Sequence, residues 1–268
     1  MQDTVKQTLA PTWQHAEERE LTLENLRLLL DNQIAAIRIR GFASAEESAR
    51  FTAAAKRGNM QYYNVSDRIG YIGMAQYQYR WSKTKAEFLA DVPKAEADVQ
   101  AVFADSFDPR QRFIDCLRAV WKQPVGIAKE DGQEYFAGII RSTSDRIDLH
   151  VDWAPVNSPD YLIGQIDAQL GWNFFAEELA SGGHTTVHNA PWAPQVESGE
   201  IPQSYGLSPS LVEDAPKFVY APTAGDVVIF NTRNPHEIAP GTTVPGGSRV
   251  SIGSFVGRLP DQSLVLWA

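Results

Sequence analysis

The sequence is short of several features that mark particular classes of protein. It has one cysteine, Cys116, so no disulfide forms within the chain, and we expect a packed thiol in a reducing, cytoplasmic setting. It has neither an apolar run of membrane-spanning length nor an apolar leader, which argues against a membrane partner. Basic residues are outnumbered, 24 Lys and Arg against 33 Asp and Glu. The net charge of −9 argues against a nucleic-acid partner, because phosphate binding needs a basic face.

The length and composition of the chain predict one domain over residues 1–268 with a large core, because 43% of the residues are hydrophobic. Residues 1–132 carry mainly helical signals. These are leucines at helical spacing over 21–32, a capping box at 44–47, a helix-like run over 94–106 and an Asp-Pro helix start at 108–109. We therefore expect a helical support region here, interrupted by a short strand at 35–39.

Residues 133–268 have a different texture, with short β-rich runs separated by Gly, Pro, Asn and Asp. Helices gathered in one half and strands in the other predict an antiparallel β core backed by helices. The Pro-rich stretch 190–216 is long for a connection inside a domain, and such loops are usually lids or binding elements.

The pair His150 and Asp152 lies in a strand-like run, 146–152. Side chains two apart on a strand point the same way, so both can bind one metal ion. His236 follows 236 − 150 = 86 residues later and completes a two-histidine, one-carboxylate set, which holds Fe(II) and leaves coordination positions open. Taken alone, His-x-Asp is equally explained by a solvated strand edge, so the surrounding motifs decide.

Two further histidines, His184 and His188, are four residues apart, a spacing that binds zinc on a helix. Their run of Gly182, Gly183 and β-branched residues predicts a strand instead. On a strand they are about 13 Å apart, too far to share a metal ion.

The surrounding motifs occur in a recognisable order: His-x-Asp, the Gly182-Gly183 hairpin, the strand Gly225–Phe230, a distal His, then Arg-x-Ser. Over residues 134–257 this order resembles the Fe(II)- and 2-oxoglutarate-dependent oxygenases. The resemblance implies a double-stranded β-helix, a jelly-roll or cupin-like fold, with Fe(II), 2-oxoglutarate and O2 as reactants. It implies iron ligands His150, Asp152 and His236, and a 2-oxoglutarate carboxylate held by Arg249 and Ser251.

The overall layout is similar to a subgroup acting on free amino acids such as lysine, which includes hydroxylases and radical halogenases. In the halogenases a Gly or Ala replaces the carboxylate ligand and frees a site for chloride. Asp152 departs from that pattern and points to hydroxylation.

We therefore expect hydroxylation of an unactivated C–H bond in a free, cationic amino acid such as lysine. Its ammonium would meet Glu134, its carboxylate Arg80, and Trp267 would cap the pocket. Each residue also has an ordinary explanation: a surface carboxylate, a cation stacked on aromatics, and packing of the chain end.

Other functions compete with this one. A cupin-like metal isomerase or hydrolase would use the same ligands, but it needs no dicarboxylate anchor such as Arg249 with Ser251. An oxygenase acting on another natural-product intermediate keeps the chemistry and changes the substrate. A non-enzymatic ligand-binding barrel leaves three metal ligands unexplained. The substrate carbon and the oligomeric state, a homodimer included, stay open.

Overall fold

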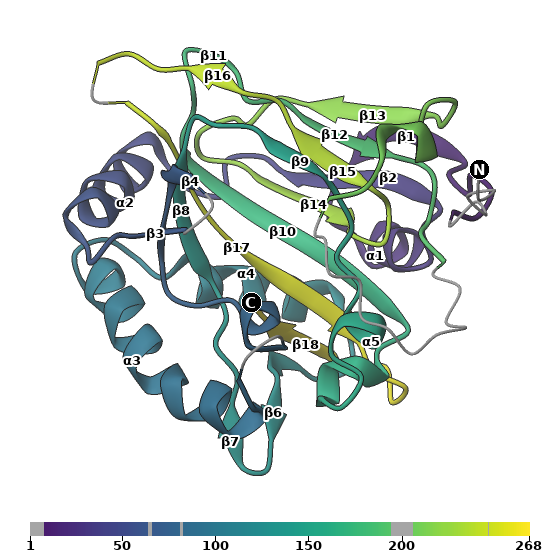
Figure 1. Ribbon diagram of the computed structural model, residues 1–268, viewed down its shortest axis with the longest axis horizontal. Coiled ribbons are helices and arrows are strands. Elements are labelled where there is room, and N and C mark those ends of the chain that lie inside the picture. Colours follow the sequence, from purple (N-terminus) through teal and green to yellow (C-terminus); the bar gives the residue numbers. More distant parts are fainter. Residues whose placement is uncertain (1–7, 64–65, 81–82, 194–205, 246) are drawn as a thin grey trace.

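A large mixed sheet forms the centre of the molecule (Figure 1). The computed structural model describes residues 8–268 apart from 64–65, 81–82, 194–205 and 246. Along the sheet the strands are ordered β1 (His15–Arg19), β2 (Ile34–Ile39), β14 (Val227–Asn231), β10 (Ala168–Glu177), β17 (Arg249–Arg258), β8 (Ile139–Thr143), β4 (Ser66–Ile72) and β3 (Gln61–Tyr63). Strand β18 (Leu264–Trp267) joins β17 to β5 (Val125–Ile127).

A smaller antiparallel sheet faces this one, with the order β13 (Lys217–Tyr220), β12 (Thr185–His188), β15 (His236–Ile238) and β9 (Ile147–His150). Buried residues from both sheets form one apolar cluster, including Val187 and Tyr220 from the small sheet and Phe175 and Phe230 from the large one. Two facing antiparallel sheets of this kind give the predicted double-stranded β-helix. Two short two-stranded sheets pair β11 (Ser181–Gly182) with β16 (Gly241–Thr242), and β6 (Lys129–Glu130) with β7 (Gln133–Glu134).

Helices cover the opposite face of the large sheet (Figure 1). They are α1 (Leu23–Leu30), α2 (Ala45–Arg57), α3 (Lys85–Ala104) and α4 (Pro109–Val120). Phe113 of α4 stacks on Trp172 of β10 with ring centroids 4.3 Å apart, and Phe51 of α2 packs edge-on against Phe174. Short turns complete the chain: η1 (Gln76–Arg80), α5 (Ala154–Asn157), η2 (Leu162–Gln165) and η3 (Pro209–Leu211). None of the described helices has the length and apolar character needed to cross a membrane.

The prediction of a helical N-terminal half was wrong. Strands β1, β2, β3 and β4 all come from residues 1–132 and all belong to the large sheet. Strand β2 pairs antiparallel with β14 and is buried along almost its whole length, so this half supplies sheet as well as support. The short strand expected at 35–39 is β2, but β1, β3 and β4 were not expected; β1 and β3 lie largely exposed and have no apolar run to mark them as strands.

Helix α3 also begins earlier than expected, at Lys85 rather than Lys94. A capping box formed by Thr84 and Glu87 starts it, and the helix continues through Pro93. Residues 194–205 of the predicted lid at 190–216 lie outside the described residues.

Candidate active site

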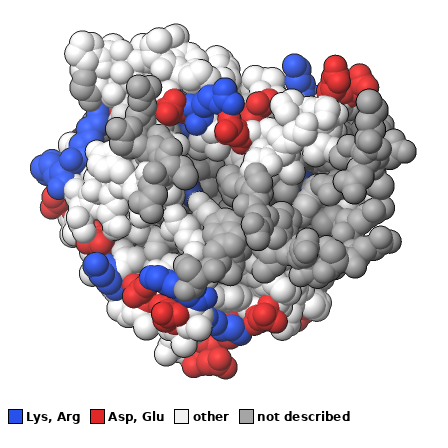
Figure 2. Space-filling model, viewed as in Figure 1, with Lys and Arg blue, Asp and Glu red and all other residues white. Residues whose placement is uncertain are grey.

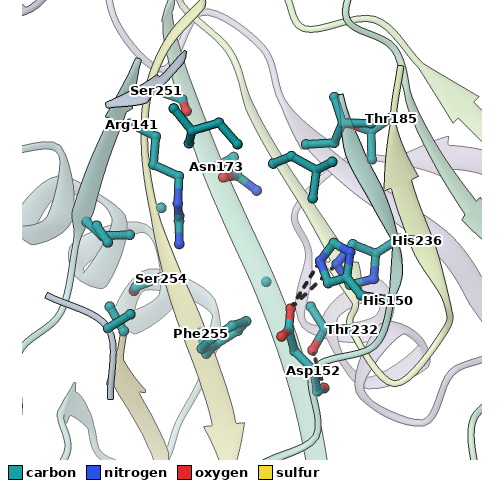
Figure 3. Close-up of a pocket in the computed structure, with 18 of the residues that line it drawn as sticks. Arg141, His150, Asp152, Asn173, Thr185, Thr232, His236, Ser251, Ser254 and Phe255 are labelled. Atoms are coloured by element: carbon teal, nitrogen blue, oxygen red, sulfur yellow. Dashed lines mark hydrogen bonds and ion pairs between the residues drawn. The ribbon is translucent and has the colours of Figure 1, made fainter. Parts of the chain in front are cut away.

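The space between the two sheets holds a cavity of about 540 Å³ (Figure 3). The residues that the sequence groups as metal ligands and cosubstrate anchors line this one cavity: His150, Asp152, His236, Arg249 and Ser251. Strands of both sheets contribute, so the cavity exists only once the sandwich is closed.

Strand pairing places the two histidines side by side. His150 ends β9, His236 begins β15, and they are direct partners in the register of that pair. Their ring centroids are 4.1 Å apart, and Asp152 Oδ2 lies 3.8 Å from His150 Nε2 and 3.5 Å from His236 Nε2. One ligand atom from each of the three residues lies within 4.8 Å of the others, close enough for a single ion.

Asp152 reaches this position by a different route from the one the spacing suggested. Strand β9 ends at His150, so the alternation of a strand does not extend to residue 152. Instead, the Asp152 amide donates to the carbonyl of Thr232 (3.0 Å), and the Thr232 hydroxyl donates to the carbonyl of Asp152 (3.0 Å). Two hydrogen bonds to one neighbour fix the backbone that carries the carboxylate.

The histidines are held in the state that a metal ion needs. Nδ1 of His150 lies 2.6 Å from the Asp148 carbonyl, and Nδ1 of His236 lies 3.0 Å from the Asn234 carbonyl. A carbonyl oxygen only accepts, so each Nδ1 carries the proton and each Nε2 offers a lone pair. Burial, with His236 nearby, lowers the pKa of His150 to about 4, so this ring is neutral at pH 7. Two imidazole nitrogens and one carboxylate are the donor set that suits Fe(II).

Arg249 is a buried cation at the same cavity. Only 4% of the residue is exposed, and no carboxylate of the described residues lies within 4.0 Å of its guanidinium. Its Nη1 donates a long hydrogen bond to the Gly183 carbonyl (3.4 Å), and its Nε has no hydrogen-bond partner. Burial lowers its pKa to about 10. A buried guanidinium of this kind is costly unless an anion pairs with it, so the cavity is suited to an anionic ligand.

The cavity is also lined by polar residues other than the predicted metal ligands and anchors. Thr185 of β12 and Tyr220 of β13 are register partners, and a hydrogen bond joins their side chains. Burial raises the pKa of Tyr220 to about 12, so its hydroxyl stays protonated. Asn173 lies on the cavity face of β10 (Figure 3). Tyr220 gave no sequence signal, because nothing in the run 217–220 marks it as a strand facing a site.

Arg141 is the other cavity residue that sequence reasoning missed. It lies on β8, and its side chain points into the cavity between Asn173 and Ser254 (Figure 3). A single arginine in a β-rich run is ordinarily a solvated residue, so nothing in the sequence distinguishes it from a surface cation.

Of the three residues predicted to bind substrate, Glu134 and Trp267 do not line the cavity. Glu134 lies exposed on β7 and does not line the cavity. Trp267 is 2% exposed and packs against the Phe255 ring at 5.6 Å; Phe255 lines the cavity and Trp267 does not. Arg80 ends η1, and its side chain lies outside the described residues.

The surface around this face carries no basic patch among the residues described. In Figure 2, basic and acidic side chains lie intermixed along the edge of the molecule. This mixture fits a small-molecule site rather than a surface for a polyanion.

Comparison with known proteins gives three results. The family described as "Carrier-protein-independent halogenase WelO5" matches residues 14–267. "Leucinostatins biosynthesis cluster protein S" of Purpureocillium lilacinum is 31% identical over 212 residues, which are 75% of this chain and 86% of that protein. "L-gamma-glutamyl-L-propargylglycine hydroxylase" of Streptantibioticus cattleyicolor is 33% identical over 165 residues, 60% of this chain and 59% of that protein.

A solved structure shows that the fold is shared more widely. The crystal structure of an N-substituted L-amino acid dioxygenase from Burkholderia ambifaria has a TM-score of 0.60 with this chain. The match covers 92% of this chain and 91% of that one at 15% identity.

Proposed function

The chain belongs to the family of the carrier-protein-independent halogenase WelO5, among the Fe(II)- and 2-oxoglutarate-dependent oxygenases, and from this premise we propose that it hydroxylates an unactivated C–H bond of an amino acid or amino-acid derivative. The enzyme is a 2-oxoglutarate-dependent dioxygenase that uses Fe(II) and O2. The substrate class and the role of each residue are the proposed part.

In this proposal His150, Asp152 and His236 hold the iron. Their proximity supports this assignment, as do the contacts of each histidine Nδ1 with a backbone carbonyl, which leave Nε2 to face the metal site. Bound there, Fe(II) supplies oxygen activation, driven by the decarboxylation of 2-oxoglutarate to succinate. The protein orients the ligands, excludes water and places the substrate carbon.

The observation that carries the proposal is the buried guanidinium of Arg249 in the same cavity as the triad. A small dicarboxylate can bind the metal at one end and pair with Arg249 at the other, with Ser251, Thr185 and Tyr220 offering hydroxyl groups nearby. A cupin-like isomerase or hydrolase has no use for this anchor. A non-enzymatic barrel has no use for the triad.

Asp152 favours hydroxylation, although the matching family takes its name from a halogenase. A chloride ion needs the coordination position that the Asp152 carboxylate fills. The two hydrogen bonds between Asp152 and Thr232 fix the backbone of this residue, so its carboxylate has little freedom to leave.

An amino-acid substrate is supported by the Streptantibioticus cattleyicolor relative, which is named as a hydroxylase of a γ-glutamyl amino acid. A free, cationic amino acid such as lysine is one member of this class. Glu134 is not at the cavity to meet its ammonium, whereas Asp145 and Asp148 line the cavity. Asp148 is already paired with Arg146, which leaves Asp145 as the better candidate.

The proposal is tested by a substrate panel under Fe(II), 2-oxoglutarate and air. The panel holds L-lysine, neutral L-amino acids, their N-acyl forms and γ-glutamyl amino acids. We expect succinate formation that depends on one substrate group, together with a mass gain of one oxygen atom in that substrate. Succinate without oxygen insertion into any amino-acid derivative would contradict the substrate class, and no 2-oxoglutarate turnover at all would contradict the function.

A further inference from the structure

Resting on the proposed function, we propose that Arg141 binds a carboxylate of the substrate, so that the enzyme acts on amino acids or derivatives whose carboxyl group is free. Neither the family match nor the relatives' names assign a substrate-binding residue. Arg141 is the cavity residue whose position and chemistry best suit this role.

The sheet register fixes where Arg141 points. Arg141 of β8 lies directly opposite Ser251 of β17, and Thr143 lies opposite Arg249. Cross-strand partners share a face of the sheet, and the face of Ser251 and Arg249 is the cavity wall. Arg141 and Arg249 are therefore diagonal neighbours, with Cα atoms about 7–8 Å apart.

Because of this offset, the two arginines can bind two different ligands within one cavity. Arg249 is buried among Thr185 and Tyr220, in the part of the cavity assigned to the cosubstrate. Arg141 extends into the open part of the cavity, on the side opposite His150, His236 and Asp152 (Figure 3). A molecule held at Arg141 thus has its body directed toward the triad.

The charge of Arg141 also favours an anionic group on the substrate. Arg141 lines the cavity and lies close enough to Arg249 to contribute to the lowering of its pKa. A substrate carboxylate is attracted to this positive charge, whereas an ammonium placed beside it is repelled.

The surroundings of Arg141 suit a carboxylate with an apolar body. Tyr77 and Tyr63 line the same cavity and are hydrogen-bonded to each other, and burial raises the pKa of Tyr77, so its hydroxyl stays protonated. Phe255 lies between Arg141 and Asp152 in the close-up (Figure 3) and offers an apolar wall for an aliphatic chain. Together these groups fit an aliphatic amino acid, free or N-acylated.

The test compares matched carboxylates and carboxamides as ligands of the protein loaded with redox-inert Ni(II) and 2-oxoglutarate. The probes are L-lysine with L-lysinamide, and N-acetyl-L-leucine with N-acetyl-L-leucinamide. Dissociation constants come from calorimetry, for wild type, Arg141→Gln and Arg141→Lys. Arg57→Gln, which removes an exposed arginine of α2, is the control for a lost charge. Each preparation is also titrated with 2-oxoglutarate.

We expect at least one carboxylate to bind wild type about 10- to 100-fold more tightly than its amide, the range for a hydrogen bond to a charged group. Arg141→Gln should abolish this preference and Arg141→Lys should keep part of it, with 2-oxoglutarate affinity unchanged in both. Equal binding of acid and amide, or no binding of either pair, overturns the proposal. So does an Arg141→Gln protein that loses 2-oxoglutarate instead, because Arg141 would then be a cosubstrate ligand. Failure of wild type to bind 2-oxoglutarate contradicts the proposed function itself.

Discussion

Replacing Arg249 by methionine should separate stability from cosubstrate binding. In the structure this guanidinium is 4% exposed and pairs with no described carboxylate. Without 2-oxoglutarate the cation is therefore a cost to the fold rather than a support. We expect Arg249→Met to leave the cosubstrate-free protein as stable as wild type or more stable, and to bind 2-oxoglutarate far more weakly.

The size of both effects follows from burial. Burial lowers the pKa of Arg249 from 12.5 to about 10, a shift of 12.5 − 10 = 2.5 units, which corresponds to roughly 3.5 kcal/mol at about 1.4 kcal/mol per pH unit. The substitution to methionine should remove a destabilisation of the cosubstrate-free fold of about this size. Leaving a buried carboxylate without its cation costs on the order of 3–5 kcal/mol, so the apparent affinity for 2-oxoglutarate should fall by about 100-fold or more.

The assay is thermal unfolding of the Ni(II)-loaded protein over a series of 2-oxoglutarate concentrations, with succinate formation by the Fe(II) enzyme measured in parallel. Arg38→Met is the matched control. Arg38 is similarly buried, 8% exposed, but it pairs with Asp226 at 3.2 Å and with Glu18 at 2.7 Å. Its loss should therefore destabilise the protein at every 2-oxoglutarate concentration and leave the affinity unchanged.

Two results would refute this reasoning. If Arg249→Met unfolds as easily as Arg38→Met, the guanidinium supports the fold and is paired in a way that the structure does not show. If Arg249→Met keeps the wild-type response to 2-oxoglutarate, the anchor lies elsewhere.

Further predictions concern the metal site. Because Asp152 fills the position that chloride needs, wild type should give only hydroxylated product in high chloride, as read by mass spectrometry, and Asp152→Gly should mainly lose activity; a chlorinated product from wild type would disprove this. Thr232→Val removes the hydroxyl that holds the Asp152 backbone and should weaken iron binding by about 10-fold, measured by competition with a chelator, whereas unchanged affinity would show that the contact is dispensable. The pKa of His150 is lowered from 6.5 to about 4, so the unfolded chain takes up a proton first as the pH falls. The metal-free protein should then lose about 1.4 kcal/mol of unfolding free energy per pH unit between about 6.5 and 4 from this group, and His150→Gln should lack that part of the slope in denaturant titrations.

The β core and the metal triad could be predicted because their signals are local. A His-x-Asp in a β-rich run, a glycine hairpin and the Gly225–Phe230 strand each constrain a few neighbouring residues. Even so, the argument that placed Asp152 beside His150, the alternation of side chains along a strand, was only partly right. Asp152 lies beyond the end of β9 and is held by Thr232, a residue 80 positions away whose role no local pattern shows.

Of the N-terminal strands in the large sheet, β2 was expected as the short strand at 35–39, whereas β1, β3 and β4 were not. Strands β1 and β3 are short and largely exposed, so neither has an apolar run that would mark a strand in the sequence. Their pairing with β2 and β4 decides their conformation. Helix α3 was placed too far along because Pro93 suggests a helix break, whereas the capping box at Thr84 had already started the helix.

The substrate contacts were the least predictable part. Arg141, Thr185 and Tyr220 become cavity residues only through the register of three strand pairs. Conversely, Glu134 looked suitable because it precedes a β run, yet it lies on an exposed hairpin. Residue type and local spacing do not report which side of a closed sandwich a side chain faces.

Iron binding by three matched proteins tests the central claim most directly. Metal-free wild type, His236→Ala and His188→Ala would be titrated anaerobically with Fe(II), and bound iron per chain measured after desalting. His188 is the control because it is a buried histidine on the adjacent strand β12, next to the residue that pairs with His236. It is hydrogen-bonded to Glu237 (3.2 Å) and is not part of the triad. We predict one iron per chain in wild type and in His188→Ala and almost none in His236→Ala. Full iron occupancy in His236→Ala would contradict the assignment of the metal centre.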